Sequence, residues 1–291
     1  MLKIAHIINP VKVPKTSDLH IAQPVTFETM RIAKEVAKNE VEVELYTAQY
    51  VEDKEIIPDF FIQTPNLNHS ILDIIDFKKR RKLPFIKDIL DRLFQISNAD
   101  YFIYTNVDIS LQKDFYVSVK KIINKGYDAF AINRRILPTY DEINDLSFLY
   151  LEAGEKHPGV DCFVFKRSSY TNYKLGKAII GANYFGKILN TNLICFSEKY
   201  KLFKNLHLTF HLGNDRSWNI KENLIFDNHN KNALRNILLD FKQKQLIKKN
   251  EMLEYYFRLT TENKLKFFIK QSLLYMFVLK IKRKICTLFC K

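Results

Sequence analysis

The sequence of 291 residues has no long apolar run and little glycine or proline. No stretch reaches the roughly 18 apolar residues that a membrane-spanning helix needs. With only 7 glycines and 8 prolines, the chain is neither collagenous nor of low complexity, and 47% hydrophobic residues against 27% charged ones exclude a disordered chain. What remains is a globular protein with enough apolar side chains for a sizeable core.

Cysteine is also scarce, and its spacing excludes some classes of site. Of the four cysteines, only Cys286 and Cys290 lie close together in the sequence. This predicts a reducing compartment and argues against a disulfide framework or a CxxC zinc site, while reactive or lipidated thiols at 286 and 290 remain open. The first residues, Met1 to Asn9, lack the charged start and cleavage site of a signal peptide, so we expect a cytoplasmic protein.

Acidic residues are outnumbered, and the imbalance is greatest at the C-terminus. Lys and Arg number 46 against 32 Asp and Glu, which gives a formal net charge of +14. Residues 263–291 contain no acid and alternate basic with apolar side chains. This pattern predicts a helix that rests on an anionic membrane surface, peripheral on the inner face, although a helix packed on the domain with solvated charges has the same pattern. Nucleic acid is not an expected partner, because no helix-turn-helix, zinc-finger or RNP pattern occurs.

The start of the chain has a β-α-β pattern. An apolar strand is expected over Ile4–Ile8, followed by a loop over Val13–Pro24 and a helix capped by Thr26. Val41–Leu45 alternates apolar and polar residues, as a half-buried strand does. The pattern indicates an α/β fold with a mixed, mostly parallel central sheet flanked by helices.

The rest of the chain continues this alternation of helices and strands. Residues Val51–Lys79 show no readable pattern. A helix is expected from Pro84 to Ser97, a second helix lies between Asp114 and Gly126, and the pattern is helical from Asn230 onward. We therefore predict a main domain over residues 1–229 and a helical C-terminal extension over 230–291. The remaining expected elements are strands at Tyr101–Thr105, Asp128–Ile132, Val160–Phe165, Leu193–Ser197 and Leu206–Phe210, and a helix at Leu175–Leu189.

Polar residues follow the most apolar of these strands. Tyr101–Thr105 is nearly continuous in apolar character, as a central parallel strand covered on both faces is, and it leads directly into Asn106 and Asp108. Residues two apart in an extended chain project to the same side, here from the carboxyl edge of the sheet, where α/β proteins bind ligands. Such oxygens suit Mg²⁺ or Mn²⁺, although Asn and Asp also end strands simply as an Asx turn.

Four segments together resemble the GT-A-fold nucleotide-diphospho-sugar glycosyltransferases of bacterial capsule and lipopolysaccharide synthesis. Tyr101–Asp108 looks like the strand that ends in the family's D-x-D motif. His157–Arg167 is similar to the strand on the acceptor side, and Leu208–His211 resembles the late strand that often supplies a metal-binding histidine. The fourth segment, Leu83–Ile89, opens the helix before the central strand.

The resemblance implies transfer of a sugar from a nucleotide-sugar donor to a glycan or lipid-linked acceptor. It implies that Asp108 and His211 hold Mn²⁺ or Mg²⁺, and that Asp161 acts as general base or hydrogen-bonds the sugar. The residues expected to bind the nucleotide sugar are Asn9, Arg81, Lys82, Lys87 and Asn106.

The sequence departs from the family pattern at two places. Asn106 stands where the family has its first carboxylate, which weakens the case for a metal and leaves metal-free catalysis by the cations open. The region 179–184 lacks the Glu-Asp pair of many inverting enzymes, so inversion and retention both stay open. Two other functions remain as alternatives: a sugar-phosphate nucleotidyltransferase, although residues 9–14 contain no glycine, and a non-catalytic module that binds polyanions or membranes.

Overall fold

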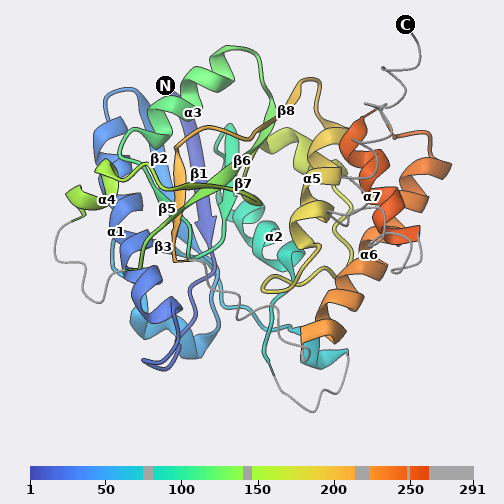
Figure 1. The fold of residues 1–291 in the computed structure, drawn as a ribbon, viewed down its shortest axis with the longest axis horizontal. Coiled ribbons are helices and arrows are strands. Elements are labelled where there is room, and N and C mark those ends of the chain that lie inside the picture. Colours follow the sequence, from blue (N-terminus) through green and yellow to red (C-terminus); the bar gives the residue numbers. More distant parts are fainter. Residues whose placement is uncertain (75–80, 140–145, 214–222, 248–249, 262–291) are drawn as a thin grey trace, which may run out of the picture. The chain divides into compact units, whose positions relative to one another are not determined.

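The computed structural model describes residues 1–74, 81–139, 146–213, 223–247 and 250–261. Within these residues the strands form one sheet in the order β3-β2-β1-β4-β7-β6-β9-β5, and β8 pairs with β6 (Figure 1). Parallel pairs outnumber antiparallel ones, and β7 is antiparallel to both of its neighbours. The strands are β1 (Leu2–Ile8), β2 (Val41–Thr47), β3 (Ile62–Gln63), β4 (Tyr101–Thr105), β5 (Ser110–Leu111), β6 (Ala129–Leu137), β7 (Glu155–Lys166), β8 (Tyr200–Phe203) and β9 (Thr209–Leu212).

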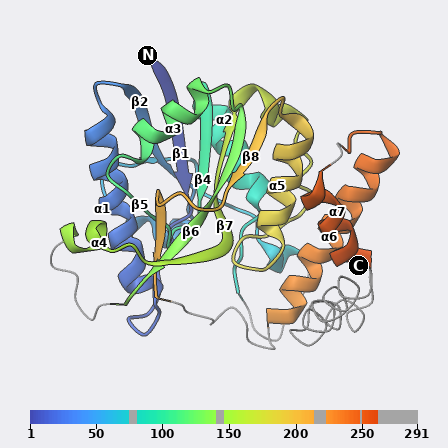
Figure 2. The ribbon, with the colours of Figure 1, turned by 45° about the horizontal axis from the view of Figure 1, so that its top comes forward.

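Helices cover both faces of this sheet, as Figures 1 and 2 show. The α-helices are α1 (Leu19–Ala37), α2 (Ile86–Ile96), α3 (Phe115–Asn124), α4 (Ser147–Leu151), α5 (Phe185–Phe196), α6 (Leu224–Gln243) and α7 (Glu251–Thr261). Short 3-10 helices occupy Val51–Ile56, Ile71–Asp73 and Arg167–Asn172. None of the helices in the described ranges is both long enough and apolar enough to cross a membrane.

The expectation of a central, doubly covered strand is confirmed at β4, although the strand is parallel to β1 only and antiparallel to β7. All five of its side chains are buried. Ile103 belongs to the core that α1 and α3 form on one face, whereas Phe102 contacts Phe94 of α2 and Tyr104 contacts Phe185 of α5 on the other. Because successive strand residues alternate between faces, an uninterrupted apolar run is what burial on both sides requires.

The chain divides into two compact units, Met1–Ile237 and Leu238–Lys291. The first contains the whole sheet. The second includes α7 and the basic tail at 263–291, and that tail lies outside the described residues. The predicted boundary at residue 229 stays a prediction.

The predicted loop over Val13–Pro24 is wrong in its second half. Helix α1 begins at Leu19 and contains Pro24, so Thr26 is not its cap. Thr26 is instead fully buried, with its hydroxyl 3.2 Å from that of Ser110 on β5. Pro24 removes one helical hydrogen bond, but burial of the neighbouring apolar side chains keeps the helix continuous.

The predicted helix over Leu175–Leu189 and strand over Leu193–Ser197 are also wrong. Gly176 and Gly181 adopt left-handed φ values of +57° and +73°, which break a helix, and α5 begins only at Phe185. The apolar residues after Leu189 continue the buried part of α5 and form no strand. A short apolar run is compatible with either element, and here the helical neighbours decide.

Smaller differences concern boundaries. Helix α2 starts at Ile86, two residues after Pro84, and α6 starts at Leu224, before the predicted Asn230. The last strand, β9, is Thr209–Leu212 where Leu206–Phe210 was expected. Strands β6 and β7 are both longer than predicted and pair with each other beyond the core, where residues become partly exposed and lose their apolar pattern.

Candidate functional site

Polar side chains from four strands meet at the carboxyl edge of β4. After Thr105 the chain leaves the strand in a tight turn, in which the Ile109 N–H donates to the Asn106 carbonyl at 3.1 Å. The prediction that Asn106 and Asp108 project together is therefore wrong, because it assumed an extended chain where the structure has a turn. The turn directs Asp108 toward β9 and Asn106 toward β7.

Asp108 lies against His211, although more than one hundred residues separate them in the sequence. The Asp108 Oδ2 atom is 3.2 Å from His211 Nε2. Register brings them together, because β5, which follows Asp108, pairs with β9 through Ser110 and Phe210. Asp108 Oδ1 is buried and has no hydrogen-bond partner among the described residues.

The His211 ring faces an acceptor on each side. Its Nδ1 lies 2.9 Å from the Gly213 carbonyl oxygen, which can only accept, so Nδ1 must carry a hydrogen. Nε2 then meets the carboxylate of Asp108, which also only accepts when ionised. The contact between Nε2 and the carboxylate is therefore favourable in two cases: Nε2 is protonated, or both groups bind one cation.

The pKa directions agree with an ionised pair in the absence of such a cation. Burial raises the pKa of Asp108, but the hydrogen bond from His211 and the charges of His211 and Arg134 outweigh burial and bring it below its usual value. Burial lowers the pKa of His211, and its hydrogen bond with Asp108 more than compensates, so its pKa is raised. A positive partner is thus what the Asp108 carboxylate requires.

A second group forms around Asp161 on β7. The Asn106 Nδ2 donates to Asp161 Oδ1 at 3.1 Å, and Tyr104 O–H donates to Asn106 Oδ1 at 3.2 Å. Arg134 of β6 forms an ion pair with Asp161 Oδ2. Both oxygens of Asp161 therefore have partners, and Asn106 is fixed by hydrogen bonds at both ends of its amide.

Arg134 joins the two groups, because its charge acts on Asp108 and on His211 as well as on Asp161. The β6–β7 register shifts on both sides of Asn133, and such irregularities commonly re-aim a side chain near a site. Arg134 Nε is buried and has no partner in the described residues. The sequence did not indicate this residue, because the predicted strand ends at Ile132, whereas β6 continues to Leu137.

Two of the expected nucleotide-binding residues lie on the other side of β4, beside the segment that follows β2. Asn9, just after β1, is buried and its Nδ2 donates to the Ala48 carbonyl at 2.6 Å. Lys82 lies with its Nζ 3.9 Å from the centre of the Tyr50 ring and 2.5 Å from Glu52. Asn9 and Lys82 therefore contact the same stretch, residues 48–52.

Arg81 and Lys87 have other partners. Arg81 donates to Asn223 Oδ1 at 3.0 Å, and its guanidinium lies 6.0 Å from the Phe226 ring centre, so it contacts the start of α6. Lys87 is exposed and pairs with Asp91 on its own helix. No contact in the described ranges joins either cation to Asp108 or Asp161.

Comparison with known proteins gives a match in structure and none in sequence. No protein-family model matches the chain, and no curated protein matches it. The 1–349 fragment of S. aureus TarS in complex with UDP-GlcNAc matches with a TM-score of 0.52 and 8% identity, over 94% of this chain and 78% of that chain. The fragment in complex with UDP matches with a TM-score of 0.54 and 9% identity, over 94% and 76%. The fold is GT-A-like.

At this level of identity the likeness extends to the fold alone. The GT-A-like fold confirms the fold class expected from sequence, including helices after the sheet. The roles of individual residues rest on the geometry at the carboxyl edge. In the described residues no three His, Cys, Asp or Glu side chains group as ligands of one metal ion.

Proposed function

We propose that this protein is a glycosyltransferase that moves a sugar from a nucleotide-sugar donor to a glycan or lipid-linked acceptor. The observation that carries the proposal is the contact of Asp108 with His211 at the carboxyl edge of β4, with the Asn106–Asp161–Arg134 group beside it. That edge is the ligand-binding edge of open α/β sheets. Support comes from the GT-A-like fold, whose TarS match contains UDP-GlcNAc.

We further propose that Asp108 and His211 bind Mn²⁺ or Mg²⁺ together with the donor. The donor set fits such an ion: Asp108 has a buried oxygen without a partner in the part of the chain that the structure describes, and His211 presents Nε2 while the Gly213 carbonyl fixes its ring. A ligating histidine ordinarily has such a carbonyl on its second nitrogen. Two protein ligands suit a cation that takes its other oxygens from phosphates and water. When bound, the ion would offset charge on the departing nucleoside diphosphate.

The remaining residues would bind and orient the substrates. We place the nucleotide at residues 48–52, where Asn9 and Lys82 converge, and the sugar near Asn106 and Asp161. Of the two roles open to Asp161, we favour orienting the sugar over general base. Both of its oxygens have partners, so a proton from the acceptor would have to displace one of them.

A screen with nucleotides tests the proposal. Thermal unfolding would be followed with UDP, GDP, CDP and their common sugar conjugates, each with and without Mn²⁺. A ligand that binds only the native state raises the melting temperature. At a ligand concentration of one hundred times Kd, the free energy of unfolding increases by about 2.7 kcal/mol. We expect one nucleotide family to stabilise the protein, more strongly with Mn²⁺. No stabilisation by any of them would favour the non-catalytic alternative.

We also propose that residues 263–291 bring the enzyme to an anionic membrane surface that carries the acceptor. The proposal rests on the sequence pattern of basic and apolar residues. Co-sedimentation with vesicles of phosphatidylglycerol tests it. The full chain should pellet with these vesicles, and a chain ending at residue 262 should stay in the supernatant. Equal sedimentation of the two chains would refute membrane binding by the tail.

A further inference from the structure

Lys187 presents an ammonium group whose charge interacts with that of Asp161. It lies in the first turn of α5, and this turn packs closely on β7: a Cβ on Gly186 would lie 3.2 Å from the Val160 carbonyl oxygen. The residue before the helix, Tyr184, has a left-handed φ of +74°, a strained conformation for a residue with a side chain. The Lys187 Nζ lies 5.2 Å from the centre of the Tyr184 ring.

The two carboxylates whose charges act on Lys187 already have other partners. Asp161 and Asp227 are the two acids whose charges act on Lys187. Asp161 is held by Asn106 and Arg134, and Asp227 accepts both N–H groups of Asn183 at 2.8 Å each. Among the residues that the structure describes, no carboxylate lies within ion-pair distance of the Lys187 ammonium.

A lysine in this situation has an unmet demand for an anion. Lys187 is only partly exposed, and burial lowers its pKa despite the two acids. A partly desolvated charge normally acquires a partner of opposite sign. The residue keeps part of its surface exposed to solvent, which leaves a route for a ligand.

We propose that Lys187 binds an anionic group, a phosphate or a carboxylate, of the acceptor substrate. The assignment to the acceptor rests on the proposed function. The position proposed for the nucleotide, Asn9 with residues 48–52, follows β1 and β2, whereas Lys187 lies on α5, which contacts β7 and β6 on the far side of β4 in the strand order (Figure 2). Asp161 is on β7, which lies between β4 and β6 in the sheet. A ligand that reaches Lys187 therefore lies past the sugar position and away from the nucleotide.

Calorimetric titration of the full chain tests this proposal. The protein would be saturated with the nucleoside diphosphate that the screen identifies, which fills the diphosphate position, and then titrated with inorganic phosphate, with glucuronate and with uncharged glucose. We expect phosphate or glucuronate to bind and glucose to bind more weakly. The Lys187→Met variant should lose about ten- to a hundredfold in affinity for the anion, as expected for a charge-assisted hydrogen bond.

Two further variants separate anion binding from a structural role. Lys187→Arg should keep most of the affinity, and Lys177→Met, which changes an exposed lysine just before α5, should behave as wild type. Lys187→Met should also raise the melting temperature, because it replaces an ammonium that has no carboxylate partner in the described ranges by an apolar chain of similar length. A structural lysine would give the opposite shift.

The outcomes distinguish this proposal from the proposed function. If a nucleotide binds but no anion does, or if Lys187→Met binds anions as tightly as wild type, the Lys187 proposal is wrong and the glycosyltransferase proposal stands. If no nucleotide binds, the titrations are run on the free protein. If only Lys187→Met then loses anion binding, the anion site at Lys187 is supported, and its assignment to an acceptor substrate is refuted.

Discussion

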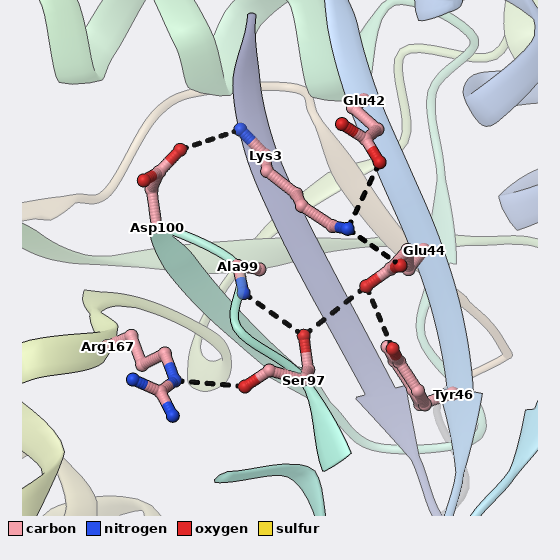
Figure 3. Close-up of polar contacts among 8 residues, drawn as sticks. All are labelled: Lys3, Glu42, Glu44, Tyr46, Ser97, Ala99, Asp100 and Arg167. Carbon is pink, nitrogen blue, oxygen red and sulfur yellow. Dashed lines mark hydrogen bonds and ion pairs between the residues drawn. The ribbon is translucent and has the colours of Figure 1, made fainter.

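The two edges of the central sheet differ in how completely their polar groups are paired. At the amino edge, where β1, β2 and β4 begin, charged and polar side chains form a connected network (Figure 3). Lys3 Nζ lies 3.1 Å from Glu42 and 3.0 Å from Glu44, and the Lys3 N–H donates to Asp100 at 2.9 Å. Glu44 also accepts from Tyr46 at 2.8 Å. We interpret this edge as structural, because its charged and polar side chains pair with one another.

At the carboxyl edge, buried atoms remain without partners among the described residues. Asp108 Oδ1, Asn133 Oδ1 and Arg134 Nε are all of this kind. Leaving a buried polar atom unsatisfied costs about 1–3 kcal/mol, so a fold keeps such atoms only where something offsets that cost. We infer that ligands supply the missing partners at this edge. We therefore treat the paired amino edge as structural and test the carboxyl edge for function.

The largest effect should come from Asp108→Asn. This change removes the carboxylate that faces His211 and, with it, the proposed cation site. Charge stabilisation by a metal ion is worth several kcal/mol, so kcat/KM should fall at least about a hundredfold. Release of nucleoside diphosphate from the donor found in the screen measures it. Sugar transfer at the wild-type rate by this variant would refute the site.

The difference between the edges was only partly predictable from sequence. The burial of β4 and the polar residues after it follow from local pattern, because an apolar run on a doubly covered strand is a local property. The tight turn after Thr105 directs Asn106 and Asp108 toward different strands, although they were expected to point together. The contact of Asp108 with His211 was expected only through the family resemblance, because no local pattern encodes the pairing of β5 with β9.

Two other site residues escaped prediction for a related reason. Arg134 is aimed at Asp161 by an irregularity in the β6–β7 pairing, which depends on both strands at once. Lys187 could not be placed while α5 was expected to begin ten residues too early, at Leu175, since the glycines that end that helical pattern act through left-handed backbone. Such features depend on tertiary context and are invisible to periodicity.

The second prediction concerns the amide and carboxylate that face each other at the site. Asn106→Asp would place a second carboxylate within about 3 Å of Asp161 Oδ1, where the Asn106 amide now donates. We expect a loss of about 1–3 kcal/mol in stability and a fall in transfer activity. The double variant Asn106→Asp, Asp161→Asn reverses the two groups and should recover part of the stability. Urea unfolding of the four proteins gives the coupling energy, and additive losses would show that the pair does not interact.

The third prediction uses His6, which lies on β1 between the two edges and is fully buried. Its ring nitrogens lie 2.9 Å from the hydroxyls of Tyr116 and Thr105, and burial lowers its pKa from 6.5 to about 3. Below pH 6.5, His6 binds a proton in the unfolded chain but stays neutral in the folded protein. Stability is therefore complete above pH 6.5 and is lost as the pH falls, by about 2 kcal/mol between pH 7.5 and 5.0.

Comparison with His6→Gln isolates this contribution. The glutamine variant should be less stable at pH 7.5, and its stability should change less between pH 7.5 and 5.0, because the side chain does not titrate. Urea unfolding at the two pH values measures the difference. Parallel pH profiles for the two proteins would mean that His6 is accessible to protons in the folded state.

The smallest effect should come from Glu44→Gln at the amino edge. The amide oxygen of glutamine can still accept from Tyr46 and Ser97, but the charge that faces Lys3 is lost. Because both partners are about one quarter exposed, with side-chain values of 24% and 25%, we expect a loss of about 1 kcal/mol or less, reduced further by salt. Transfer activity below the melting temperature should stay at the wild-type value. A variant that kept its stability but lost activity would mean that the paired edge also serves function, and the contrast between the two edges would no longer identify the site.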